Sequence, residues 1–221
     1  MFNWDWEFTW QILPRLLLAT GNTVIAALLG YLIAIVLGLV LTSLLRSKPL
    51  IVAVVTREMI EFIRSTPLLV QVFLVFYVGP QFGLRLSPWV AGMLAIGLHY
   101  ACYLSEVYRG GIDAVARGQF EAATALNMLP RQMYTRIILP QAFPLCIPGM
   151  GNYLIGIFKD TPMLSVIGVT ELTRAANSIG GESYRFLEPF TLVGLIFLVI
   201  SLPSAGLVKL VDGYVRRRQG M

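Results

Sequence analysis

The segment Glu121–Gln141 reads EAATALNMLPRQMYTRIILPQ and is a polar, arginine-containing interruption in a very apolar chain. Its first part, Glu121–Leu126, is rich in alanine and favours a helix. Asn127 tolerates the left-handed backbone that ends a helix, and Pro130 suits the first turn of the next one. The segment is too polar to cross a bilayer and too ordered to be a loop. We therefore predict a helix pair on one membrane face, shaped to dock with a partner in water.

The rest of the chain has the composition of a protein that crosses a membrane several times. Of its 221 residues, 57% are hydrophobic and 13% are charged, and the mean hydropathy is +0.73. Soluble domains carry about 25% charged residues. The net charge of +5 then reflects membrane topology and not nucleic-acid binding. With one histidine and no CxxC pair, we expect neither a metal site nor a disulfide framework.

Five apolar stretches are long enough to span a bilayer, which takes about 20 helical residues. We predict spans at Leu16–Leu45, Ile51–Gly79, Pro88–Glu106, Ile137–Phe158 and Pro189–Val208, the fourth interrupted by prolines. The expected fold is an all-α membrane protein with five transmembrane helices in one domain, residues 1–221. An odd number of spans places the two termini on opposite sides of the membrane.

Lysine and arginine collect in the connections that face the cytoplasm. If the N-terminus lies outside, the basic residues fall in the first connection, in the long polar connection and at the C-terminus: Arg46, Lys48 and Arg57; Arg109, Arg117, Arg131 and Arg136; Lys209 and Arg216–Arg218. We therefore predict an N-out/C-in orientation. The Glu121–Gln141 segment is then cytoplasmic, and residues 161–188 lie outside.

Three elements of the polar segment occur in a specific order. Glu121-Ala122-Ala123 is followed by a helix breaker, Asn127, and then by Ile-Ile-Leu-Pro ending at Pro140. This order resembles the EAA loop of ABC importer membrane subunits, whose coupling helices dock on a cytoplasmic ATPase. Glycine is the usual breaker there, and asparagine tolerates the same backbone conformation.

Other segments resemble the polar amino acid branch of that family. These are FIRSTPLLVQ at 62–71, EVYRGG at 106–111, GQFEAA at 118–123, GN at 151–152 and FKDTPM at 158–163. Two departures stand out, because Ser65 replaces a usual glycine and Pro162-Met163 replaces Ser-Leu. The resemblance extends from about residue 16 to the basic C-terminal tail.

The resemblance implies a permease subunit in a bacterial inner membrane that crosses the membrane several times. Its partners would be a cytoplasmic ATP-binding subunit, an extracytoplasmic solute-binding protein and a second permease, either an identical copy or a sister chain. The chain would be no enzyme and hold no cofactor, since it contains no GxxxxGK[ST] and ATP would be bound by the partner. The coupling loop would cover about residues 110–136, and its coupling residues would be Gly118, Glu121, Ala122, Ala123, Asn127 and Pro140.

Ionisable groups at membrane depth are costly and face a cavity or another part of the protein. We expect the substrate path among the residues Arg64, Thr66, Gln71, Asn152, Lys159, Asp160 and Thr161. Lys159 and Asp160 meet the two charges of a zwitterionic solute, pair within the protein (with each other, with Arg64 or with Glu106), or reach the outer interface by snorkelling. Arg64, Thr66 and Gln71 either line the path or serve helix packing or gating, and we favour the second role. For Glu106 we favour an ion pair with Arg109 on the same helix.

The substrate class is also an expectation from the resemblance. It would be polar amino acids or related zwitterions, including compatible solutes such as ectoine. Two other function classes stay open at this point. One is an ion-coupled secondary transporter or channel subunit, and the other is an intramembrane enzyme that uses His99, Ser105 and Glu106. The glycines of the first span, Gly21, Gly30 and Gly38, predict close helix packing.

Overall fold

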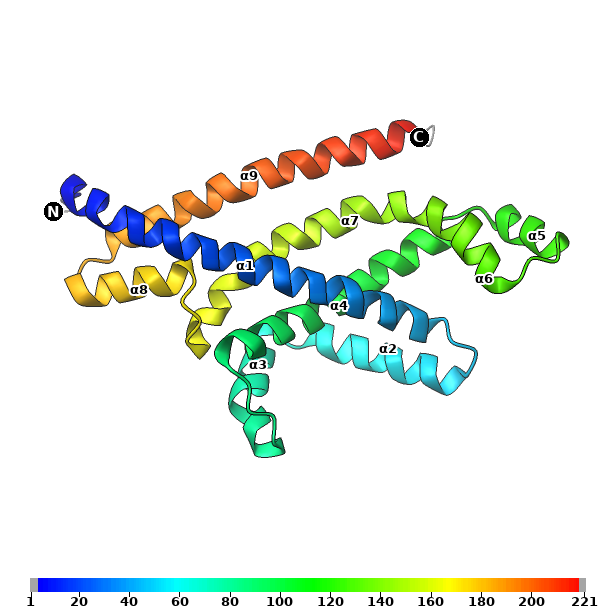
Figure 1. Cartoon of the computed structure of the whole chain (residues 1–221), viewed down its shortest axis with the longest axis horizontal. Helices are drawn as coiled ribbons and strands as arrows, with labels where there is room; N and C mark the ends of the chain where they lie inside the picture. The colour runs from blue at the N-terminus through cyan, green and yellow to red at the C-terminus, as the bar shows by residue number, and fades with distance from the viewer. Residues whose placement is uncertain (1–3, 219–221) are drawn as a thin grey trace.

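The computed structural model describes residues 4–218, and every regular element in that range is helical (Figure 1). In chain order the elements are α1 (Trp6–Leu45), α2 (Leu50–Ser65), α3 (Leu68–Phe73), the π-helical turn η1 (Leu74–Val78), the 3-10 turn η2 (Gly79–Phe82), α4 (Pro88–Asp113), α5 (Arg117–Ala125), α6 (Pro130–Met133), the π-helical turn η3 (Tyr134–Ile138), α7 (Leu139–Asp160), the 3-10 turn η4 (Thr161–Ile167), α8 (Leu172–Ser183) and α9 (Leu187–Arg218). The predicted all-α fold is confirmed for this range.

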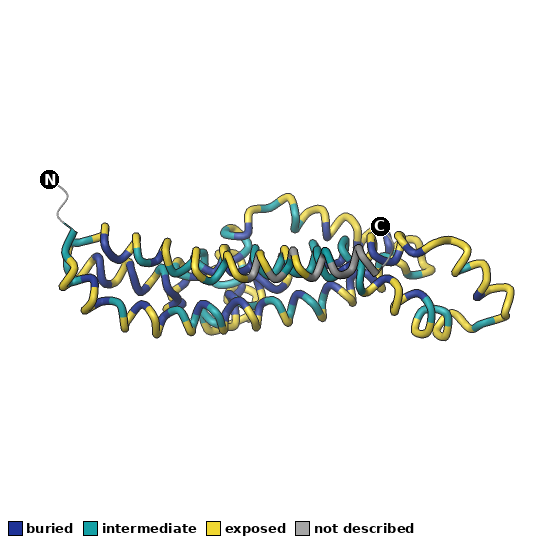
Figure 2. The backbone as a smooth tube through the Cα atoms, turned by 90° about the horizontal axis from the view of Figure 1, so that it is seen from above, coloured by how far each residue is buried: buried dark blue, intermediate teal, exposed yellow. Residues whose placement is uncertain are grey.

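The long helices lie roughly along one axis (Figures 1 and 2). Helices α1, α4 and α7 pack together, and α9 runs along α7. The connection after α1, the α5–α6 segment and the C-terminal end of α9 lie toward one end of the molecule, whereas the N-terminus and α8 lie at the other. The α5–α6 end projects beyond the helices and is largely exposed (Figure 2).

Small residues let α1 and α4 approach closely. A Cβ atom added at Gly97 would lie 2.4 Å from Cγ2 of Ile33 and 3.3 Å from the carbonyl oxygen of Gly30. One added at Gly30 or Gly38 would also be crowded, at 3.0 and 3.1 Å from the nearest side-chain atoms of α4. The predicted close packing is therefore confirmed for these two glycines of α1. It is wrong for Gly21, where an added Cβ would meet nothing within 4 Å.

The segment predicted as the second span is not one straight helix. Helix α2 ends at Ser65, and the helical residues after it are bent by 104° relative to α2. The cause is Pro67, which disfavours helical geometry at the residue before it, and Thr66 is extended with φ −101° and ψ 140°. The crossing predicted over 51–79 corresponds to a bent pair of helices, Leu50–Ser65 and Leu68–Phe82.

The prediction that prolines interrupt the fourth span is wrong for Pro144 and Pro148. Helix α7 continues through Pro144 and Pro148, and the irregular π-helical turn precedes it at Tyr134–Ile138. By length and composition, α1 and α4 are long and apolar enough to cross a membrane, and the bent α2–α3 pair would make a third span within residues 4–218. The count of five spans and their direction stay predictions.

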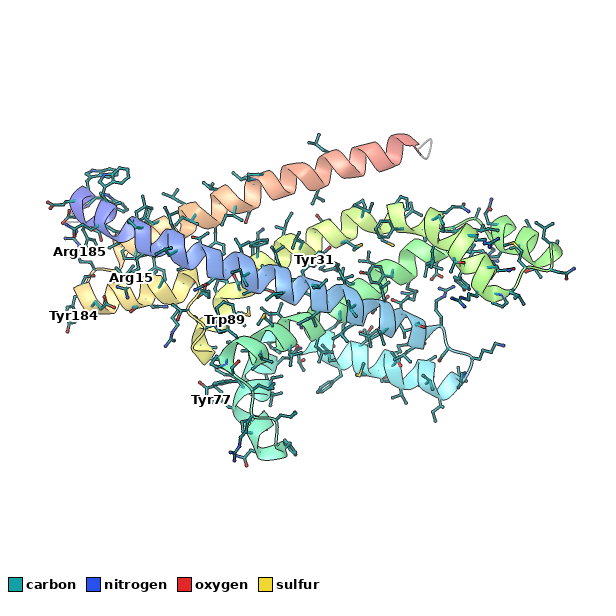
Figure 3. The ribbon with its side chains drawn as sticks, in the orientation of Figure 1. Arg15, Tyr31, Tyr77, Trp89, Tyr184 and Arg185 are labelled. Atoms are coloured by element: carbon teal, nitrogen blue, oxygen red, sulfur yellow. The ribbon has the colours of Figure 1, made fainter. Side chains whose placement is uncertain are left out.

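Helix α8 is fastened to α1 at the end that holds the N-terminus. Glu171 caps α8 by accepting hydrogen bonds from the backbone N–H groups of Thr173 and Arg174. Further along, Arg15 lies between α1 and α8 (Figure 3). Both of its terminal nitrogens donate to the carboxylate of Glu182, at 2.7 and 2.9 Å. The bonds from Arg15 lower the pKa of Glu182 to about 2. The carboxylate therefore stays charged to well below neutral pH.

The packing of α1 against α4 predicts a contrast between two glycine substitutions. Gly97→Ala should lower the thermal unfolding temperature of the purified chain in detergent, because the new methyl group overpacks the interface at a cost of about 1–3 kcal/mol. Gly21→Ala is the matched control on α1 and should leave the temperature unchanged or raise it, since alanine favours a helix. Equal behaviour of the two variants would contradict the proposed tight contact.

Candidate functional site

The turn between α5 and α6 has a defined backbone geometry. Asn127 adopts φ 51°, the left-handed conformation expected from the sequence. The N–H of Met128 bonds to the carbonyl of Ala123 at 3.1 Å, and that of Asn127 bonds to Thr124 at 2.9 Å, the pair of bonds that closes a Schellman motif. Pro130 then starts α6. The predicted helix break at Asn127 and restart at Pro130 are both confirmed.

One side of this segment is anchored and the other is presented to the surroundings. Ala123 is buried, and the segment joins α4 and α7 through an apolar cluster around Ile112, Val115, Ile138 and Ala142. In contrast, Leu126 is 74% exposed and Leu129 is 64% exposed. The other predicted coupling residues Gly118, Glu121, Ala122 and Pro140 are exposed as well. Two exposed leucines at a rigid turn are the kind of apolar surface that a protein partner covers.

A polar, aromatic cavity of about 600 Å³ lies between α4 and α7. Its wall is built by residues that recur at helical spacing on two facing helices: His99, Tyr100, Tyr103 and Val107 of α4, and Gly149, Asn152, Tyr153, Gly156 and Asp160 of α7. The hydroxyl of Tyr100 donates to Oδ2 of Asp160 at 2.6 Å. Gly156 leaves room for this hydroxyl, because an added Cβ would lie 2.9 Å from it.

A cation lies next to the aromatic wall. The guanidinium carbon of Arg64, at the end of α2, is 5.1 Å from the ring centroid of Tyr103, within the range of a cation–π contact. The Tyr103 and Tyr153 centroids are 5.4 Å apart. Arg64 also pairs with Glu61, and within residues 4–218 its buried Nε has no hydrogen-bond partner. An acidic group, Asp160, and a basic group, Arg64, therefore flank one set of tyrosines.

Gln71 ties the bend of α2–α3 to α4. Its amide nitrogen donates to the carbonyl of Ile63 and to Oγ1 of Thr66, both at 2.7 Å. Its amide oxygen is 3.2 Å from Nδ1 of His99, which lines the cavity. Thr66 and Gln71, both predicted for the path, thus hold the cavity wall in place and do not form it.

The structure separates two other predicted path residues from the cavity. Lys159 lines a different pocket beside α9, with Phe197 and Ser201 among its neighbours. Thr161 is fully buried, and its hydroxyl donates a hydrogen bond to the carbonyl oxygen of Phe158, near the end of α7. Lys159 and Asp160 are adjacent in sequence but line different pockets, because successive side chains on a helix point about 100° apart.

Two further observations concern residues outside the predicted path. The ion pair between Glu106 and Arg109 is confirmed. The tyrosines of the cavity were missed by the sequence analysis. The sequence feature that could have identified two of them is the spacing of Tyr100 and Tyr103, which lie one turn apart on a span that also carries His99.

Comparison with protein families gives a match over most of the chain. Residues 30–217 match the family described as "Binding-protein-dependent transport system inner membrane component". This range contains the α5–α6 segment and the polar cavity.

Individual relatives match over nearly the whole chain. A probable amino-acid ABC transporter permease protein of Sinorhizobium fredii is 43% identical, covering 98% of this chain and 96% of the relative. A nopaline transport system permease protein of Agrobacterium fabrum is 35% identical, covering 96% and 92%. A chain from the crystal structure of an amino acid ABC transporter with histidines superimposes with a TM-score of 0.89 at 31% identity, covering 96% of this chain and all of that one.

The left-handed residue of the exposed turn can be tested directly. Asn127→Val should accelerate hydrogen exchange of the Met128 amide about tenfold, because a β-branched residue at positive φ strains the Schellman closure. Asn127→Gly is the control and should exchange as the unmodified chain does, since glycine adopts this conformation freely. An unchanged rate in the valine variant would mean that the turn does not depend on the conformation of residue 127.

Proposed function

Since this chain belongs to the family of binding-protein-dependent inner membrane transport components, we propose that it forms, with a second permease, the path for a polar amino acid or related zwitterion. The energy comes from a separate cytoplasmic ATPase, and an extracytoplasmic binding protein delivers the solute. We propose this role in place of the two alternatives, an ion-coupled secondary transporter or channel subunit and an intramembrane enzyme. The second permease is either an identical copy or a sister chain.

The proposed topology keeps five spans in an N-out/C-in orientation. Helices α1 and α4, the bent α2–α3 pair, α7 and α9 would supply the crossings, all within one transmembrane domain over residues 1–221. In support, the first connection, the α5–α6 segment and the end of α9 lie toward one end of the molecule (Figure 1). These parts hold eight of the 17 basic residues, Arg46, Lys48, Arg117, Arg131, Lys209 and Arg216–Arg218, and basic residues collect on the cytoplasmic face.

The solute would occupy the polar cavity between α4 and α7. Asp160 would bind the ammonium group and Arg64 the carboxylate, with Asn152 and the tyrosines between them. The observation that carries this assignment is that one carboxylate, bonded to Tyr100, and one guanidinium, stacked on Tyr103, contact neighbouring tyrosines whose ring centroids are 6.1 Å apart. A zwitterion matches such a pair of charges. The names of the relatives, an amino-acid permease and a nopaline permease, agree with this class.

The ATPase would bind the coupling loop, about residues 110–136 together with Pro140. Its contact surface would centre on Leu126 and Leu129, which are exposed on either side of the Asn127 turn. Gly118, Glu121 and Ala122 would lie on the exposed side of α5, and buried Ala123 would anchor it.

The coupling assignment predicts the effect of a charge at the turn. Leu126→Asp should weaken binding of the ATPase by about 30-fold, because a buried apolar anchor typically contributes about 2 kcal/mol. The measurement is copurification of the ATPase with the tagged permease, followed by ATP-dependent uptake in proteoliposomes. Leu50→Asp is the control, since Leu50 is 76% exposed at the start of α2 and outside the loop. Undiminished copurification with Leu126→Asp would refute this surface.

The solute assignment separates two adjacent residues. Asp160→Asn should raise the KM for uptake of labelled histidine, arginine or nopaline by about 10-fold or more, since a hydrogen bond to a charged group contributes about 1.5–3 kcal/mol. The amide oxygen can still accept from Tyr100, so the wall should persist. Lys159→Met is the control and should leave the KM unchanged. The reverse pattern would return the site to Lys159.

A further inference from the structure

His99 is the single histidine of the sequence and lines the polar cavity between α4 and α7. It is 8% exposed, and its ring packs against two tyrosines of the same wall, with centroids 5.4 Å from Tyr100 and 5.2 Å from Tyr103. Tyr100 bonds to Asp160, and the guanidinium of Arg64 lies over Tyr103. His99 therefore contacts the tyrosine beside each of the two charges proposed to bind the solute.

The orientation of the Gln71 amide is fixed by its neighbours. Its nitrogen lies 2.7 Å from the carbonyl oxygen of Ile63 and 3.2 Å from that of Thr66. Carbonyl oxygens only accept hydrogen bonds, so the group that faces them is the NH₂ group and not the amide oxygen. The amide oxygen consequently points the other way, to Nδ1 of His99 at 3.2 Å.

The Gln71 oxygen decides which ring nitrogen of His99 carries the hydrogen. An amide oxygen has no hydrogen to donate, so Nδ1 of His99 is the donor in this contact. Burial among aromatic rings favours the uncharged imidazole, which has one donor and one acceptor nitrogen. Nε2 of His99 is therefore left as an acceptor.

This acceptor is open to an occupant of the cavity. Within residues 4–218, the only hydrogen bond of the His99 ring is the one at Nδ1, so Nε2 is unpaired. The unpaired side-chain atoms that are closed to solvent in this range belong to Trp4, Ser47, Arg64 and Tyr108. Nε2 is not one of them, so it is accessible, and the cavity that His99 lines is the space from which it is reached.

We propose that His99, held as an acceptor by Gln71, selects solutes whose side chain donates a hydrogen bond. The inference rests on the proposed function, in which Asp160 binds the ammonium group and Arg64 the carboxylate. Nε2 then accepts from an amide, guanidinium or imidazole N–H of the side chain. A side chain without a donor leaves Nε2 unpaired and binds more weakly. A side-chain carboxylate is disfavoured in the same way, because its oxygens only accept.

The first test determines the tautomer without changing the protein. Because the sequence has one histidine, the full chain made with isotopically labelled histidine and a histidine-free affinity tag gives the signals of a single imidazole. It is assembled with the unlabelled ATPase in lipid, and proton–nitrogen correlation spectra should show Nδ1 protonated and Nε2 unprotonated. A protonated Nε2, in the reverse tautomer or in a charged ring, would overturn this inference and leave the proposed function standing.

The second test measures selectivity in the permease–ATPase complex without the binding protein. The solutes are labelled glutamine, arginine and nopaline, which donate from the side chain, and methionine, whose side chain has the length of glutamine but no donor. His99→Phe keeps a ring against the tyrosines and removes both nitrogens. It should weaken binding of the three donors about fivefold and leave methionine unchanged. Asp160→Asn is the comparison and should weaken all four, because every solute carries the ammonium group.

The results separate the two proposals. No loss, or an equal loss for donors and methionine, in a folded His99→Phe would overturn the role of His99, and the site itself stands if Asp160→Asn weakens binding. If the unmodified complex binds none of the four solutes, or Asp160→Asn weakens none, the proposed function fails and this inference fails with it. If His99→Phe does not fold, the tautomer of the unmodified chain decides.

Discussion

The close contact between α1 and α4 is the constraint on which the rest of the structure depends. At Gly97 the approach leaves no space for a methyl group between α4 and α1, so the two helices are fixed relative to one another along their length. Helix α4 can then supply two different surfaces. Val107 lines the polar cavity, whereas its neighbour Tyr108 lines a separate pocket among α1, α4 and α7 and packs its ring against Gly38 of α1.

The sequence predicted the features that depend on local backbone chemistry. Asn127 tolerates a left-handed conformation that few residues adopt, and Pro130 is favoured in the first turn of a helix, so the exposed turn was predicted correctly in detail. Pro67 carries equally local information about the residue before it. The bend at Pro67 was not predicted because the apolar sequence continues beyond it, so residues 51–79 were assigned to one span.

The candidate site was predicted less completely because cavities depend on which helix faces meet. Asp160 and Asn152 were identified as polar residues at membrane depth, and both line the cavity. Lys159 was grouped with Asp160 because the two are adjacent, but rotation of about 100° per residue on a helix separates their side chains. The tyrosines were missed because aromatic residues are common in spans, and only the approach of α4 to α7 gives them a shared wall.

The way in which the exposed turn is anchored gives the proposed coupling a physical route. The segment carrying Leu126 and Leu129 packs through Phe120 and Tyr134 on the apolar cluster that includes Ile112 of α4 and Ala142 of α7. These helices continue from that cluster to the walls of the polar cavity. A partner that pulls on the turn therefore acts on the ends of both helices at once, and close-packed helices transmit such a displacement as rigid bodies. The contacts of Gln71 with Ile63 and His99 link the α2–α3 bend, and with it Arg64, to α4. A movement of α4 relative to α7 would therefore change the distance between Asp160 and Arg64, the two groups proposed to bind the solute.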